Sequence, residues 1–249
     1  MQLTSPRYHV DVNGVSIPYL KEGNGPPMLL LHGSGMSSST WRHNIEPLSE
    51  YFSVYALDFP GFDDPAQHFL PDHILEESAE RVYGVISALA IDRAHLVGNS
   101  IGGSIAALVT LQRPEKVHRL VLIGAVGLRE APYFEAKNTG HQTNSLAEMI
   151  ASAGESPEVP LKASRLFDPQ MLQGLERQSL MERPVLIITG ESDPFIHREA
   201  VCYIAARNPF AKCVIIPEAG HLPHEEQPEV VNRQIISYCI EVPVSTFCG

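Results

Sequence analysis

The sequence has few of the features that would link it to nucleic acid or to a membrane. Only 18 Lys and Arg residues stand against 29 Asp and Glu residues in a chain of 249, a formal net charge of −11 at pH 7. The phosphates of nucleic acid and of anionic lipid repel such a chain, so neither is expected as a partner. No apolar run approaches the roughly 20 residues of a membrane-spanning helix. The expected partner is a small, neutral molecule.

Cysteine is also scarce, and its placement excludes two classes of site. The chain has 4 cysteines, and none forms a Cys-x-x-Cys pair or stands beside histidine at metal-binding spacing. We therefore expect free thiols, with no metal site and no disulfide framework. The first residues, 1–7, lack the apolar core of a secretory signal, so a cytoplasmic protein is expected. The cysteines are Cys202, Cys213, Cys239 and Cys248.

Strand-like and helix-like segments alternate along most of the chain, which predicts an α/β fold with a doubly wound, mostly parallel sheet. A hairpin at 7–20 turns at Asn13-Gly14, the residue types of a type I′ turn. The length fits one α/β domain. The further strands are predicted at 27–31, 53–57, 95–97, 117–123, 184–189 and 212–216, and the helices at 39–51, 72–89, 101–112, 199–207 and 228–238.

The alternation stops between residues 127 and 182, which divide the predicted core into 1–126 and 183–249. The segment has weak helical pieces and no long strand. It is too long for an ordinary loop and too small for a core of its own. We therefore predict a short helical lid over the sheet edge, with Met149 and Phe167 among the side chains that line a substrate pocket.

A glycine-flanked serine stands between the predicted strand at 95–97 and the predicted helix at 101–112. Residues 98–102 have the pattern Gly-x-Ser-x-Gly, a nucleophile elbow. Such a turn holds the serine in a strained backbone conformation, and the glycines leave room for backbones that pass close by. The helix begins beside the serine, where its dipole favours developing negative charge. The pattern therefore predicts Ser100 as a nucleophile.

Serine is a weak nucleophile, so it needs a base, and the base needs a group that orients it. Functional side chains in a parallel sheet gather at the carboxyl ends of the strands. Asp193 follows the predicted strand at 184–189, and His221 follows the one at 212–216. Serine, aspartate and histidine thus appear in the chain order of an α/β hydrolase. Glu191 is close to Asp193, but it is expected to point away from the site if Asp193 points into it.

The chain resembles the α/β-hydrolase fold superfamily over nearly its whole length. It departs from the usual pattern after residue 61, where Gly61-Phe-Asp-Asp-Pro65 replaces the common ending Gly-x-Gly-x-Ser. Five motifs carry the resemblance: His32-Gly33, Asp58-Phe-Pro-Gly-Phe62, Gly98-Asn-Ser-Ile-Gly-Gly103, Gly190-Glu-Ser-Asp-Pro194 and Gly220-His-Leu-Pro-His-Glu-Glu-Gln-Pro228.

The resemblance implies an oxyanion hole made by the backbone N–H groups of Ser34 and Ile101, with His32 ordering the first of these loops. No metal or organic cofactor is implied. The lone tryptophan, Trp41, matches a family position and is expected to pack in the core. His224 is expected to be solvated or structural, because it lies past a proline at the start of the closing helix.

We expect hydrolysis of a small carboxylic ester or thioester through an acyl-enzyme. The alternative within the superfamily is carbon–carbon bond cleavage of vinylogous diketones, in which Asn99 would touch substrate. Those enzymes commonly carry tryptophan after the catalytic histidine, where this chain has Leu222. A third possibility is a ligand-binding protein that does not hydrolyse. The predicted pocket residues are His32, Asn99, Met149, Phe167 and Leu222.

Overall fold

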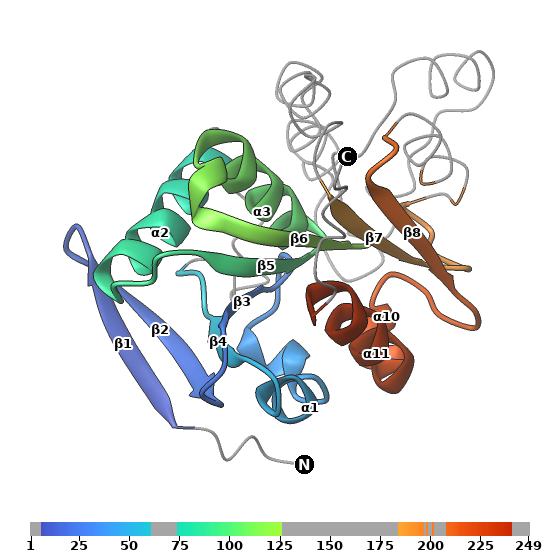
Figure 1. The fold of residues 1–249 in the computed structure, drawn as a ribbon, viewed down its shortest axis with the longest axis horizontal. Helices are drawn as coiled ribbons and strands as arrows, with labels where there is room; N and C mark the ends of the chain where they lie inside the picture. Colours follow the sequence, from blue (N-terminus) through green and yellow to red (C-terminus); the bar gives the residue numbers. More distant parts are fainter. Residues whose placement is uncertain are drawn as a thin grey trace, which may run out of the picture.

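A computed structural model describes residues 6–60, 74–125, 184–196, 198, 201 and 208–240. Within these residues, eight strands form one sheet in the order β1-β2-β4-β3-β5-β6-β7-β8 (Figure 1). Only β2 runs antiparallel to its neighbours, and the other pairs are parallel. The strands are β1 (Arg7–Val12), β2 (Val15–Glu22), β3 (Pro27–Leu31), β4 (Ser53–Leu57), β5 (Ala94–Asn99), β6 (Val117–Ile123), β7 (Val185–Gly190) and β8 (Ala211–Ile216).

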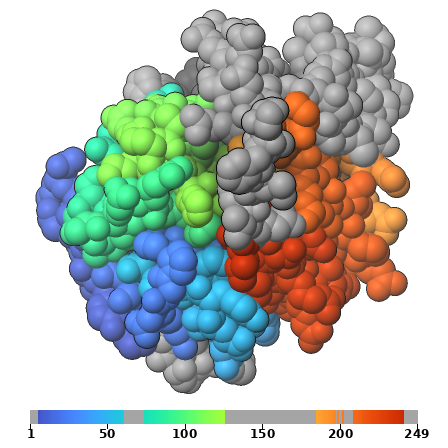
Figure 2. All heavy atoms as spheres, viewed as in Figure 1, coloured from blue at the N-terminus to red at the C-terminus, as the bar shows by residue number. Residues whose placement is uncertain are grey.

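Helices cover both faces of the sheet, as a doubly wound fold requires. In Figure 1, α2 and α3 lie on one face, and α1, α10 and α11 lie on the other. Figure 2 shows the segment of α10 and α11 (red) beside the segment around α1 (light blue), so residues far apart in the sequence build one layer together. The helical elements are η1 (Ser38–Trp41), α1 (Ile45–Ser49), α2 (Ile74–Ala88), α3 (Ile101–Gln112), η2 (Pro114–Lys116), α10 (Pro223–Glu226) and α11 (Pro228–Ile240).

The buried strands contribute side chains to two separate apolar clusters, one on each face of the sheet. In β3, Leu29 and Leu31 join the cluster under α2 and α3, whereas Met28 and Leu30 join the cluster under α1 and α11. Side chains alternate between the faces of a strand, so a strand covered on both sides must be apolar at every position. This is why the central strands read as continuous apolar runs.

Most predicted elements are confirmed, some of them to the residue. The helix at 101–112 and the strands at 27–31, 53–57 and 117–123 have the predicted bounds. The hairpin turn has φ of 53° at Asn13 and 82° at Gly14, the positive pair of a type I′ turn.

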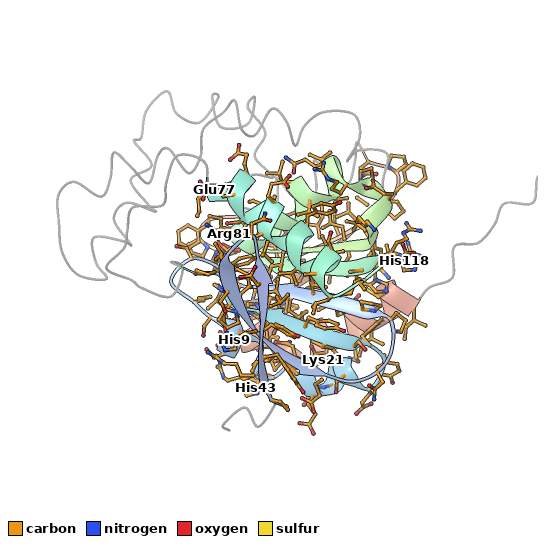
Figure 3. All side chains as sticks on the ribbon, turned by 90° about the vertical axis from the view of Figure 1, so that its left-hand side faces the viewer. His9, Lys21, His43, Glu77, Arg81 and His118 are labelled. Carbon is orange, nitrogen blue, oxygen red and sulfur yellow. The ribbon has the colours of Figure 1, made fainter. Side chains whose placement is uncertain are left out.

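Helix α2 has the amphipathic character that its sequence predicts. Its inner face is buried and includes Leu75, Ala79 and Val82. Its outer face carries Glu77 and Arg81, which form an ion pair of 3.4 Å between residues four apart and are labelled on α2 in Figure 3. The helix is therefore held to the sheet by one apolar stripe.

The single helix predicted at 39–51 is wrong. The structure has η1 and then α1, with a break between them. Pro47 has no N–H, and in a continuous helix its ring would collide with the carbonyl group four residues earlier. The structure instead places Pro47 in the first turn of α1. Asn44 lies in the break, and its side-chain nitrogen donates to the carbonyl of His224 (3.1 Å) and to Oδ1 of Asn232 (2.8 Å).

Several predictions lie outside the described residues. These are the lid at 127–182, the helix at 199–207 apart from Val201, and the cysteines Cys202 and Cys248. Cys213 and Cys239 are free thiols, and burial raises the pKa of Cys239 to about 12. In the part of the chain that the structure describes, no helix has the length and apolar character to cross a membrane.

Candidate active site

Three parallel strands carry polar residues just past their carboxyl ends, at one edge of the sheet. Ser100 directly follows β5, Asp193 follows β7 after a short turn, and His221 follows β8. The strands are adjacent in the sheet or separated by one strand, and each ends at the same side. The polar residues that follow them are therefore brought together, as the sequence predicts.

Ser100 sits in the strained turn that the elbow pattern predicts. Its backbone has φ 54° and ψ −122°, and its N–H donates to the carbonyl of Ile123 (3.0 Å). A β-carbon at position 98 would lie 2.3 Å from the carbonyl oxygen of Gly102, and one at position 102 would lie 2.3 Å from that of Leu31. Only glycine fits both positions, so the two glycines of the motif are required by backbone packing.

Ser100, His221 and Asp193 form a continuous chain of hydrogen bonds. His221 Nε2 lies 3.0 Å from Ser100 Oγ, and His221 Nδ1 lies 3.0 Å and 3.2 Å from the two carboxylate oxygens of Asp193. A carboxylate only accepts, so Nδ1 carries the proton and Nε2 is free to accept the serine hydroxyl proton. This is the arrangement that turns a serine hydroxyl into a nucleophile.

The Asp193 carboxylate is held by its own turn. Its Oδ1 accepts the N–H groups of Phe195 (2.8 Å) and Ile196 (3.0 Å), and its side chain has no exposed surface. The Phe195 ring meets the His221 ring edge-on, with centroids 4.7 Å apart. Glu191 is exposed, as predicted for the acid that points away from the site.

Gly124 lies directly against the pair of Asp193 and His221, although it was not among the site residues predicted from the sequence. Its φ is 49°, and a β-carbon there would stand 3.1 Å from Asp193 Oδ2 and 3.2 Å from His221 Nδ1. The available signal was a glycine immediately after the predicted strand at 117–123. A side chain at this position would press on the hydrogen bond that orients the histidine.

The loop after β3 lies beside the serine. A β-carbon on Gly33 would be 3.3 Å from Ser100 Cβ. His32 is fully buried, and its Nε2 accepts the N–H of Phe59 (3.0 Å), so its Nδ1–H donates to the carbonyl of Gly33 (2.8 Å). The N–H and C=O of a trans peptide point in opposite directions, so the N–H of Ser34 points away from the His32 ring.

The two predicted oxyanion donors come from different elements. Ser34 lies in an exposed turn after β3, whereas Ile101 is the first residue of α3 and is buried. The first N–H groups of a helix have no acceptor within it, so the Ile101 N–H is available beside the Ser100 hydroxyl. Both predicted positions therefore flank the serine.

The predicted pocket residues differ in where they lie. Asn99 is fully buried, and its side-chain nitrogen donates to the carbonyls of Ile123 (3.1 Å) and His221 (3.3 Å). Leu222 is partly exposed beside His221. Met149 and Phe167 lie outside the described residues. Asn99 therefore links the end of β6 to the loop that carries His221.

The profile of the alpha/beta hydrolase family matches residues 28–234 of the chain. The chain belongs to this family. The matched range begins in β3 and ends in α11, so it includes every strand that carries a residue of the site. The fold, the elbow and the order of the three polar residues agree with that membership.

Relatives of this alpha/beta hydrolase carry out different reactions. The dihydrolipoyllysine-residue acetyltransferase component of the acetoin cleaving system of Pseudomonas putida is 28% identical over 239 residues, with 86% of this chain and 63% of the relative covered. The chain thus spans less than two thirds of that relative. Carboxylesterase YbfK of Bacillus subtilis is 29% identical over 242 residues, with 86% and 80% covered. A crystal structure of the meta-cleavage product hydrolase CumD matches with TM-score 0.68 at 25% identity, covering 93% of this chain and 97% of that one.

In this alpha/beta hydrolase, His224 lies close to His221 in sequence but forms part of a buried network. Its side chain is fully buried, Nε2 lies 2.9 Å from Thr40 Oγ1, and its ring centroid is 4.4 Å from that of Trp41. Burial lowers the pKa of His224 to about 3, with smaller contributions from His221 and Arg42. Of the two roles expected for it, solvated or structural, the structure therefore shows the structural one. Trp41 is fully buried, as expected.

The described residues of the hydrolase hold no group of three or more His, Cys, Asp or Glu side chains placed to bind a metal ion.

Proposed function

We propose that this alpha/beta hydrolase is a serine hydrolase that cleaves a small carboxylic ester or thioester through an acyl-enzyme on Ser100. One observation carries the proposal. Ser100 Oγ, His221 and the Asp193 carboxylate are linked by hydrogen bonds of 3.0 Å at each end of the imidazole. A buried, oriented acid and a partly accessible serine at a strained turn are what nucleophilic acyl transfer needs.

In the proposed mechanism, His221 takes the Ser100 proton as the serine oxygen attacks the substrate carbonyl carbon. Asp193 keeps the proton of the imidazole on Nδ1 and stabilises the positive charge that forms on the ring. The N–H groups of Ser34 and Ile101 bind the oxyanion. His221 then gives its proton to the leaving alcohol or thiol, and water cleaves the acyl-enzyme with the same histidine as base.

The substrate class rests on likeness and on sequence. The similarity to carboxylesterase YbfK supports ester cleavage. The apolar side chains of the segment at 127–182, including Met149 and Phe167, are proposed to contact an apolar part of the substrate. We propose a small molecule as the partner, because the acidic chain disfavours polyanions.

Carbon–carbon bond hydrolysis is the second candidate. It is favoured by the likeness to the meta-cleavage product hydrolase CumD at TM-score 0.68. The same serine, histidine and oxyanion donors would serve it. Two observations favour the ester reaction. Leu222 stands where the diketone hydrolases commonly carry tryptophan, and the Asn99 amide is fully buried and donates to the backbone carbonyl of His221. Ligand binding without hydrolysis is the third candidate.

A fluorophosphonate probe and a substrate panel test the proposal together. The probe is expected to form one adduct on the Ser100 peptide. Ser100→Ala is expected to lose about 10⁴- to 10⁶-fold in turnover while keeping its fold. Ser104→Ala, one turn further along α3, is the matched control, and its Ser100 is expected to react with the probe as in wild type. Normal turnover in Ser100→Ala would end the proposal.

The panel separates the three candidates. It contains p-nitrophenyl esters of increasing acyl length beside a ring-fission dienoate. Turnover of the esters at more than about tenfold the kcat/KM of the dienoate supports the esterase, and the reverse ratio supports the carbon–carbon hydrolase. Binding of either compound without turnover supports the ligand-binding protein.

A further inference from the structure

A single carboxylate holds the backbone on both sides of His221. The N–H of Gly220 donates to Glu226 Oε2 (2.6 Å), and the N–H of Leu222 donates to Glu226 Oε1 (2.9 Å). The two amides belong to the residues immediately before and after the histidine. One side chain therefore bridges the segment from which the imidazole projects.

The local sequence explains why this carboxylate turns back. Helix α10 begins at Pro223, after Leu222, and Leu222 has no side chain that can cap it. A glutamate in the first turn commonly accepts the N–H of the cap residue. Glu226 does this for Leu222, and its second oxygen reaches two residues further back to Gly220. Charged acceptors make such bonds shorter and stronger than neutral ones.

The neighbouring glutamate has a different task. Glu225 pairs with Arg42 (2.6 Å) and accepts the hydroxyl of Thr40, so it ties α10 to η1. Glu226 makes no such link and contacts the loop of His221. The two consecutive carboxylates therefore have different roles. Glu225 anchors α10 to η1, and Glu226 anchors the loop that carries His221.

A third backbone group of the segment is also held. The carbonyl of His221 accepts the side-chain nitrogen of Asn99 (3.3 Å), which precedes Ser100. A β-carbon at Gly190 would lie 2.1 Å from the carbonyl oxygen of Gly220, so the end of β7 packs against the same loop. With Glu226, these contacts leave the three residues 220–222 little freedom to shift.

We propose that Glu226 is a positioning residue that holds His221 within reach of both Ser100 Oγ and Asp193. The proposal rests on the proposed function, because it assigns Glu226 to the same proton transfer. The imidazole must keep two hydrogen bonds of 3.0 Å in opposite directions. A displacement of about 1 Å at a reacting group costs about 10²-fold in rate. Glu226 acts through the backbone and touches no substrate.

Three variants isolate this role. Glu226 is exposed, so replacing it leaves no buried cavity. Glu226→Ala removes both acceptors. Glu226→Gln keeps the shape and one carbonyl acceptor, but turns an NH₂ group toward the second amide. Glu229→Gln is the control, because this exposed glutamate in the first turn of α11 loses the same charge three residues away.

The kinetic readout separates positioning from binding. For p-nitrophenyl butyrate, Glu226→Ala is expected to lower kcat by about 30- to 100-fold and Glu226→Gln by about tenfold, with KM changed less than about twofold. The rate of fluorophosphonate labelling at Ser100 is expected to fall by the same factors. Glu229→Gln stays within about twofold of wild type. Equal kcat in Glu226→Ala and Glu229→Gln would overturn the proposal.

A second readout does not depend on catalysis. With ¹⁵N-labelled histidine, the Nδ1–H of His221 is followed by NMR in its hydrogen bond to Asp193. That signal is expected to shift or vanish in Glu226→Ala and to persist in Glu229→Gln. If the protein hydrolyses no substrate but the signal changes, Glu226 still positions His221 and the proposed function alone has failed. If Ser100→Ala is inactive while Glu226→Ala keeps both signal and rate, the function stands and the role of Glu226 is wrong.

Discussion

Gly124 lies directly behind the imidazole of His221, where a β-carbon would stand 3.2 Å from Nδ1. The same β-carbon would be 3.1 Å from Asp193 Oδ2, so it would press on both partners of one hydrogen bond. The backbone at Gly124 also has a φ of 49°, which residues with side chains adopt at a cost. The end of β6 therefore forms one wall of the site, although it contributes no side chain.

We expect Gly124→Ala to lower kcat by about tenfold or more, because the added methyl group forces the acid and the histidine apart. It is also expected to lower the free energy of unfolding by about 1–2 kcal/mol, from the cost of positive φ in an alanine. Kinetics with a p-nitrophenyl ester and urea unfolding measure the two effects. Gly14→Ala is the control, because Gly14 has φ of 82° with nothing within 4 Å of its β-carbon. It should lose stability but keep kcat. An unchanged kcat in Gly124→Ala would contradict the prediction, because it would show that the backbone at residue 124 shifts without disturbing Asp193 and His221.

Asp193→Asn is expected to lower kcat by about 10⁴-fold, because an amide nitrogen facing His221 Nδ1 favours the wrong tautomer. Glu191→Gln, two residues earlier and exposed, is expected to stay within about twofold of wild type. Steady-state kinetics on the best ester of the panel compare the two. A near-normal Asp193→Asn beside an inactive Glu191→Gln would transfer the acid role to Glu191.

His32→Ala is expected to lower kcat by about 10- to 100-fold with a smaller change in KM. The substitution removes the donor that holds the Gly33 carbonyl at 2.8 Å and thereby frees the peptide that carries the Ser34 N–H. It also removes the acceptor of the Phe59 N–H, which costs about 1–3 kcal/mol of stability. His9→Ala, at an exposed position on β1, is the control. If kcat and stability are both unchanged, His32 does not order the loop.

Two buried histidines are expected to make the fold sensitive to acid. Burial is the main cause that lowers the pKa of His224 to about 3 and that of His95 to about 4. An unfolded histidine takes up a proton as the pH falls below about 6.5, whereas these two stay neutral in the folded state. The unfolded state then binds more protons than the folded state, so the free energy of unfolding decreases as the pH is lowered. Each histidine contributes up to about 1.4 kcal/mol per pH unit between about pH 6 and pH 4.

Urea unfolding at about pH 7, 6 and 5 measures this slope. His224→Gln and His95→Gln are each expected to flatten it by about one proton, and the double variant by about two. Each variant is compared with wild type at the same pH, since loss of the bond to Thr40 lowers stability at every pH. A double variant with the slope of wild type would show that other groups cause the acid sensitivity.

Much of the site could be predicted because its signals are local. The serine is marked by two glycines at fixed spacing. Asp193 and His221 are marked by their places just after apolar strands, since parallel strands bring their carboxyl ends to one edge. The break near Asn44 also had a local signal in Pro47, which the single helix predicted at 39–51 did not take into account. Where two local signals conflict, as the helix start at Ser39 and the proline at position 47 do, neither alone predicts the bounds of the helix.

What the sequence by itself determined is the order of strands and helices, the elbow, and the chain order of its polar partners, because periodicity and backbone sterics act between near neighbours. The tertiary structure alone decided that Gly124 backs onto His221, that His224 is buried against Thr40, and that Glu226 turns back to the amides of Gly220 and Leu222. These depend on distances across packed segments or on the path of one loop, to a fraction of an ångström. No spacing in a sequence encodes such distances.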